Sequence, residues 1–167
     1  MNTKPNKPHA DLNLEFRHIK AKKIAKLLEI YNKTPKLKIL EIGTGSGGIA
    51  HYFSTLGHDV FAVDPVDNRM IKEGYHFQTV SDTTLPFPDH SFDIIISNHV
   101  IEHVGATEQQ LHHLQEIKRT LKESGKAYLA VPNRWMLIEP HYKLIFLSFL
   151  PIALRTPYLR LCKKGDF

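Results

Sequence analysis

The stretch KILEIGTGSGGIA, residues 38–50, decides how the rest of the chain is interpreted. An apolar run ends at Ile42, four glycines follow within six positions, and apolar residues resume at Ile49. Glycine lets the main chain turn tightly and approach a ligand without a Cβ in the way. The stretch therefore predicts a strand, a ligand-binding loop and a helix. This pattern does not say which ligand approaches the glycine backbone, or why the acidic residue Glu41 comes directly before the glycines.

Short apolar runs alternate with helix-like segments along the chain. The runs cover residues 37–42, 59–63, 76–80, 92–97 and 126–131, and the helical patterns cover residues 12–31, 46–56, 66–73 and 107–123. Strands that alternate with helices form a parallel sheet covered on both faces. We predict an α/β fold with a Rossmann-like, doubly wound, mostly parallel sheet, whose ligand site lies at the carboxyl ends of the strands.

Length and composition fit one domain of 167 residues with a formal net charge of +5. A single cysteine, Cys162, excludes an internal disulfide, and no apolar run is long enough for a signal peptide or a membrane span. We expect a soluble, cytoplasmic protein with a disordered lead-in over residues 1–11 and one domain over residues 12–167. Basic clusters at residues 17–26 and 155–164 fit either a solvated helix face or an acidic ligand or membrane surface.

Two ligand classes compete for the glycine loop. Gly43, Gly45 and Gly48 match G-x-G-x-x-G, the pattern that binds the pyrophosphate of a dinucleotide. Glu41 with Gly43, Gly45 and Gly47 matches E-x-G-x-G-x-G, which resembles the first motif of the class I methyltransferases. A carboxylate repels a pyrophosphate and attracts the ammonium and sulfonium of S-adenosylmethionine, so Glu41 favours the methyl donor.

The resemblance to class I methyltransferases becomes specific further along the chain. Asp64 ends the second predicted strand, the position at which an acidic residue binds the ribose hydroxyls. The segment LPFPDHSFD, residues 85–93, leads into the fourth predicted strand, as it does in this family. In this family an Asp after the third strand meets the adenine amino group, and Asp82 is the matching residue. The resemblance covers residues 37–132 and implies S-adenosyl-L-methionine as cofactor, bound by Glu41, Gly43, Thr44, Gly45, Gly47, Asp64, Pro65, Asp82, Thr83 and Asn98.

Three histidines are candidates for the base that methyl transfer needs. His99 matches the family position nearest the transferring methyl, His103 follows one helical turn later, and His141 lies after the fifth strand with Glu139 as an alternative. A pocket-lining role for His99 and a structural role for His103 stay open. HVIEH at residues 99–103 also matches a zinc-protease signature, but it follows a buried strand, so we predict no metal site. We expect His112 and His113 to face solvent.

The acceptor is only loosely defined by the sequence. No N/D-P-P-Y/F segment and no Pro-Cys nucleophile are present, so we expect no nucleic-acid substrate and favour O-methylation of a small-molecule or lipid/saccharide-linked acceptor. Residues 133–167 form an acceptor-side tail, which is either a membrane-surface segment or a buried helix and loop. The tail shows no clear strand pair for the family's C-terminal antiparallel hairpin, so we expect a truncated chain, a homodimer or a reduced variant of the fold. The alternative function is that of a non-catalytic, S-adenosylmethionine-binding or regulatory subunit.

Overall fold

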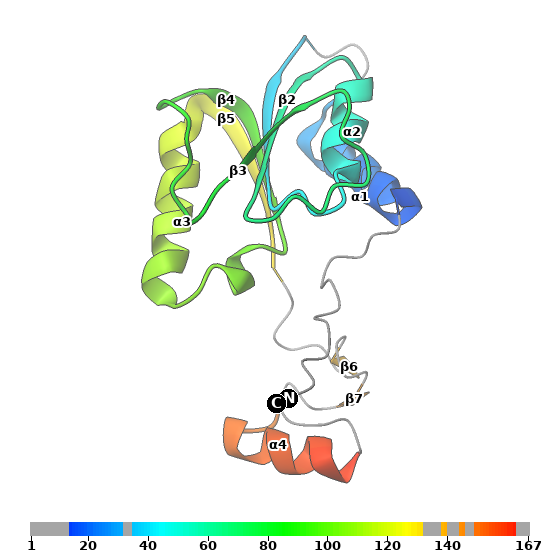
Figure 1. Cartoon of the computed structure of the whole chain (residues 1–167), viewed down its shortest axis with the longest axis vertical. Coiled ribbons are helices and arrows are strands. Elements are labelled where there is room, and N and C mark those ends of the chain that lie inside the picture. Colours follow the sequence, from blue (N-terminus) through cyan, green and yellow to red (C-terminus); the bar gives the residue numbers. More distant parts are fainter. Residues whose placement is uncertain (1–13, 32–34, 132–137, 140–143, 146–148, 163–167) are drawn as a thin grey trace. The chain divides into compact units, whose positions relative to one another are not determined.

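A computed structural model describes residues 14–31, 35–131, 138–139, 144–145 and 149–162 (Figure 1). The chain forms two compact units, residues 1–131 and 132–167. The division lies next to residue 133, where the sequence predicts the tail to begin. The first unit contains α1 (Leu14–Leu28), β1 (Lys38–Ile42), α2 (Gly48–Thr55), β2 (Asp59–Asp64), β3 (His76–Thr79), β4 (Phe92–Asn98), the short 3-10 helix η1 (Ile101–His103), α3 (Thr107–Thr120) and β5 (Leu121–Ala130).

The first unit is built on a five-stranded sheet in the order β3-β2-β1-β4-β5, and every neighbouring pair is parallel. β1 and β4 lie inside the sheet, and nearly all of their residues are buried, as expected for parallel strands covered on both faces. The register places Ile42 beside Val63 of β2 and Ser97 of β4. The predicted Rossmann-like α/β fold is confirmed.

Helices cover both faces of this sheet (Figure 1). On one face α1 and α2 pack against Ile39, Val60 and Ile96, with Phe53 of α2 completely buried. On the other face Ile117 of α3 packs against the alternate strand residues, which include Leu40 and Ile95.

The prediction of a helix over residues 66–73 is wrong, because this segment consists of bends and irregular backbone. The Asp67 carboxylate accepts a hydrogen bond from the backbone N–H of Arg69. It also forms an ion pair with the Arg69 guanidinium at 2.8 Å. The backbone N–H of Met70 donates to the carbonyl of Ser46 in the glycine loop at 3.0 Å. Amide groups that a helix would use internally are therefore bonded elsewhere.

β5 begins earlier than predicted, at Leu121, directly after α3. Its register with β4 shifts between Phe92 and Ile94, so the continuous pairing starts at Lys126, where the sequence places the strand. Among the described strands β5 pairs with β4 alone.

The second unit contains β6 (Ile138–Glu139), β7 (Leu144–Ile145) and α4 (Ile152–Leu161). β6 and β7 form a separate two-stranded antiparallel sheet. No helix in the described ranges of either unit is long and apolar enough to cross a membrane.

Candidate functional site

The predicted site residues of the first unit gather at the carboxyl ends of neighbouring strands. The glycine loop follows β1, Asp64 ends β2, and Asn98 ends β4. Because Ile42 lies beside Val63 and Ser97, the residues that come next on these strands share one edge of the sheet. This is the edge at which open α/β sheets bind ligands.

The glycine loop depends on backbone conformations that other residues adopt only with strain. Gly43 and Gly47 have φ of 74° and 82°, in the left-handed region. A Cβ on Gly47 would lie 2.7 Å from the carbonyl oxygen of Ile71, and a Cβ on Gly43 would lie 2.5 Å from a methyl group of Val100. At these two positions glycine is therefore required by the packing of the loop against the chain itself.

Glu41 is buried beneath this loop, with 2% of its surface exposed. One carboxylate oxygen, Oε2, accepts hydrogen bonds from the Thr44 hydroxyl at 2.7 Å and from the backbone N–H of Ala50 in α2 at 2.9 Å. Burial raises the pKa of the Glu41 carboxyl from 4.5 to about 8, although both hydrogen bonds and Arg17 oppose the shift. Glu41 thus joins β1, the loop and α2, and it holds a proton at neutral pH.

Asp64 is bound by the backbone of two loops. Its Oδ2 accepts a hydrogen bond from the N–H of Gly45 at 2.9 Å, and its Oδ1 accepts one from the N–H of Val66 at 3.2 Å. Asp64 is half-buried, whereas Pro65 after it is exposed. The aspartate is therefore held at the carboxyl end of β2, next to the glycine loop.

Asp82 and Thr83 lie in the loop that follows β3. Asp82 is exposed, and its Oδ1 accepts a hydrogen bond from the backbone N–H of Thr84 at 2.7 Å. Hydrogen bonds from Thr84 lower the pKa of the Asp82 carboxyl, so it is ionised at neutral pH. The Thr83 hydroxyl shares a hydrogen bond of 2.6 Å with Nδ1 of His112 on α3.

Asn98 is buried, and its Oδ1 has no hydrogen-bond partner among the described residues. A buried amide oxygen without a partner is rare, because losing its hydrogen bonds to water costs about 1–3 kcal/mol. Ser97, the residue before it, shares a hydrogen bond of 3.0 Å with Nε2 of His113. Within the described part of the chain, Asn98 therefore offers an unused acceptor at the end of β4.

His99 follows β4 with an unusual backbone. Its φ is 57°, in the left-handed region, and its N–H donates to the carbonyl of Ala130 on β5 at 2.8 Å. The imidazole Nδ1 lies 3.4 Å from Oε1 of Glu102, and nearly half of the side chain is exposed. His103 ends η1 and is exposed.

The zinc-protease pattern at residues 99–103 does not form a metal centre in the described part of the chain. No group of three or more His, Cys, Asp or Glu side chains able to hold an ion occurs there. His141 lies outside the described residues, and only the backbone of Glu139 is described.

The expectation that His112 and His113 face solvent is wrong. His113 is 1% exposed, and burial lowers its pKa, while His112 is half-buried against Thr83. Glu116 and Arg119 on the same helix also bind the loop before β4, and neither is among the predicted site residues. The spacing of residues 112, 116 and 119 places them on one helix face, a signal that was available in the sequence.

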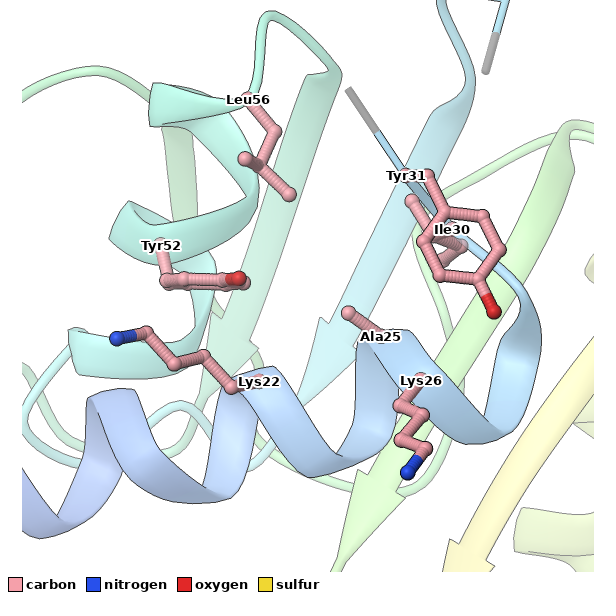
Figure 2. A pocket seen from close by; sticks show the side chains of 7 residues that line it. All are labelled: Lys22, Ala25, Lys26, Ile30, Tyr31, Tyr52 and Leu56. Carbon is pink, nitrogen blue, oxygen red and sulfur yellow. The ribbon is translucent and has the colours of Figure 1, made fainter. Parts of the chain in front are cut away.

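An open groove of about 740 Å³ lies away from these residues, between α1 and α2 (Figure 2). Lys22 and Lys26 of α1 line it, together with Tyr31, Tyr52 and Leu56. α2 starts at the glycine loop and runs back along the sheet, so its far end, where Leu56 lies, is remote from the carboxyl ends of the strands. The groove and the candidate site are separate features.

Comparison with known proteins assigns the family. Residues 40–129, more than half of the chain, match the model of a methyltransferase domain. The chain is 29% identical over 123 residues to the ubiquinone biosynthesis O-methyltransferase of Rickettsia akari, covering 66% of this chain and 47% of that protein. It spans about half the length of the curated relatives it matches.

Solved structures agree with this assignment. A protein of Pyrococcus horikoshii is 25% identical with a TM-score of 0.58, covering 71% of this chain and 59% of that one. The YcgJ protein of Bacillus subtilis is 27% identical with a TM-score of 0.54, covering 66% and 49%; a curated relative of this name is an uncharacterised methyltransferase. With the parallel sheet and the glycine loop, these matches confirm the resemblance: the chain belongs to the methyltransferase domain family, of the class I, S-adenosylmethionine-dependent type.

Proposed function

We propose that this protein transfers a methyl group from S-adenosyl-L-methionine to a small-molecule or lipid/saccharide-linked acceptor, at oxygen, and releases S-adenosyl-L-homocysteine. The main support is the meeting of the glycine loop, Asp64 and Asn98 at one edge of the sheet in a chain of this family. An O-methyltransferase among the curated relatives supports oxygen as the acceptor atom.

The described residues fit this cofactor. Gly43, Thr44, Gly45 and Gly47 would bring main chain close to it. Asp64 and Pro65 would meet the ribose, and Asp82 with the backbone of Thr83 would meet the adenine edge. Asn98 supports the assignment independently, because its buried Oδ1 has no partner among the described residues and could accept a hydrogen bond from the cofactor's ammonium.

Glu41 would affect cofactor binding in two ways: it fixes the conformation of the glycine loop, and it becomes negatively charged when it loses its proton. Its Oε2 is already bonded to the loop and to α2. Because the pKa of this carboxyl is about 8, a nearby cation would favour loss of the proton. Binding of the positively charged cofactor would therefore be coupled to ionisation of Glu41.

For the reaction, S-adenosylmethionine supplies an electrophilic methyl group on its sulfonium. The residues of the chain have to align the acceptor and remove its proton as the new bond forms. His99 is our first candidate for the base, and His103 and His141 are the others. The Glu102 carboxylate, 3.4 Å from Nδ1 of His99, would hold the proton of that nitrogen and leave Nε2 free to accept the acceptor's proton.

Calorimetry with S-adenosylhomocysteine and, separately, NAD tests the cofactor. We expect heat with S-adenosylhomocysteine and none with NAD, and we expect Asp64→Ala to abolish the binding. Heat with NAD alone would overturn the proposal.

A labelled-methyl transfer screen on cell extract tests the reaction and finds the acceptor. We expect His99→Asn to lower transfer by roughly 100-fold or more while S-adenosylhomocysteine still binds, since asparagine tolerates the left-handed backbone at this position. If His103→Asn has this effect instead, His103 is the base.

A non-catalytic, S-adenosylmethionine-binding or regulatory role is the second candidate. It is favoured by β5, which has only β4 as a neighbour among the described strands, whereas this family's sheet normally continues further. Cofactor binding without transfer to any extract component would support this role. Cosedimentation with lipid vesicles and the mass of the protein in solution would test the proposed membrane contact of the tail and the proposed homodimer.

A further inference from the structure

One face of α3 is bonded to the segment that precedes β4. His112, Glu116 and Arg119 lie four and three residues apart, so their side chains project from the same side of the helix. Each of them reaches residues between Thr83 and Asp89. We refer to these three residues as the α3 clamp.

Glu116 and Arg119 bind the main chain of this segment. The Glu116 carboxylate is buried and accepts a hydrogen bond from the N–H of Leu85 at 2.8 Å. The Arg119 guanidinium donates to the carbonyls of Leu85 at 3.0 Å and Phe87 at 2.8 Å. It also forms two hydrogen bonds of 2.7 Å to Glu116. Charged groups that bind each other and the same segment restrict its position strongly.

His112 extends the clamp to the start of the segment. Its Nδ1 shares a hydrogen bond of 2.6 Å with the hydroxyl of Thr83. Thr83 follows Asp82, whose carboxylate is bonded to the backbone of Thr84 at 2.7 Å. The two residues assigned to the adenine edge thus lie within a turn that His112 anchors from outside.

We propose that the α3 clamp, acting through the bond between His112 and Thr83, sets the selectivity of the site for the adenine base. The inference rests on the proposed function and deepens it. His112 does not contact the cofactor in this scheme; it is a positioning residue. Recognition of an exocyclic amine by a carboxylate and of a ring nitrogen by an amide depends on the placement of both groups, which an anchored turn maintains.

The test measures the affinity of the full chain for two ligands that differ only in the base, S-adenosylhomocysteine and S-inosylhomocysteine. The second carries a carbonyl where adenine has its amino group, so Asp82 should disfavour it. We expect His112→Ala to weaken S-adenosylhomocysteine binding about fivefold, the effect of one lost hydrogen bond, and to reduce the preference for adenine. His112→Asn, whose amide can replace Nδ1, should restore both values.

Three further variants separate positioning from stability. Thr83→Val should weaken binding as much as His112→Ala, and the double variant should be no worse than either, because both remove the same bond. Gln115→Ala, at an exposed position of the same helix, should change neither affinity nor selectivity.

Two results with the His112 variants would overturn the inference. In one, His112→Ala leaves the ratio of the two affinities unchanged. In the other, the ratio falls but His112→Asn restores neither the affinity nor the preference for adenine. If the unaltered chain binds S-inosylhomocysteine and S-adenosylhomocysteine equally, the inference fails while the proposed function stands. If it binds neither, both fail.

Discussion

Glu41 shows at the scale of one residue how the fold changes the chemistry of a motif. In the sequence it is a negative charge in front of a glycine loop. In the structure its carboxyl is buried, and burial raises its pKa to about 8. The hydrogen bonds from Thr44 and Ala50 make the loop depend on it, so the residue is both a structural link and a group that can be charged when a cation binds.

This pKa predicts how stability depends on pH. The folded chain keeps a proton on Glu41 that the unfolded chain releases above pH 4.5, so the contribution of Glu41 to stability should fall as the pH rises from 4.5 to about 8 and then level off. Glu41→Gln removes this contribution and keeps an oxygen for both hydrogen bonds. Its stability relative to the parent should rise by up to about 1.4 kcal/mol per pH unit in that range.

Urea unfolding of both proteins at pH 5, 6, 7 and 8 measures the difference. Glu73→Gln, which alters an exposed carboxyl, serves as the control. Parallel stability curves for Glu41→Gln and the parent would contradict the prediction.

At the scale of elements, the connection between β1 and α2 is held by contacts from outside it. The Met70 N–H bonds the carbonyl of Ser46, and the side chain of Tyr75 and the carbonyl of Ile71 occupy the space where a Cβ of Gly47 would lie. The segment predicted as a helix over residues 66–73 is therefore irregular and packs against the glycine loop.

Gly47→Ala should be more destabilising than Gly57→Ala. Both glycines have a left-handed backbone, with φ of 82° and 88°, so both substitutions add about 1–2 kcal/mol of strain. Only at Gly47 would the new Cβ meet backbone, because among the described residues nothing lies within 4 Å of a Cβ at Gly57. Thermal unfolding of the two variants should show the larger loss for Gly47→Ala, and equal losses would refute the steric argument.

At the scale of the whole molecule, the residues proposed to bind the cofactor all lie within residues 1–131, and the predicted acceptor-side residues begin at 133. We expect a chain ending at Val131 to bind S-adenosylhomocysteine as tightly as the full chain and to lose methyl transfer. Calorimetry and the labelled-methyl assay on both chains measure this. A shortened chain that folds, by circular dichroism, but binds no S-adenosylhomocysteine would show that residues 132–167 contribute to the cofactor site.

The strands and the glycine loop could be predicted because their signals are local. Buried parallel strands are apolar over their whole length, and the loop carries the glycines its backbone requires. Helix ends and turns were less predictable. The pattern over residues 66–73 fits a helix, but Asp67 and Ser46 bind its amide groups in other ways. The helix pattern alone predicts that His112 and His113 face solvent, whereas the two side chains bind Thr83 and Ser97 on distant segments.

The sequence by itself determined the α/β fold, the order of its parts and the acidic residue before the glycine loop, because spacing, apolar periodicity and residue type are properties of the chain. Only the tertiary structure decided that Glu41 is buried and protonated, that Asn98 keeps a free acceptor among the described residues, and that α3 anchors the loop of Asp82 and Thr83. These depend on which groups lose water and which meet across distant segments, and no local pattern records that.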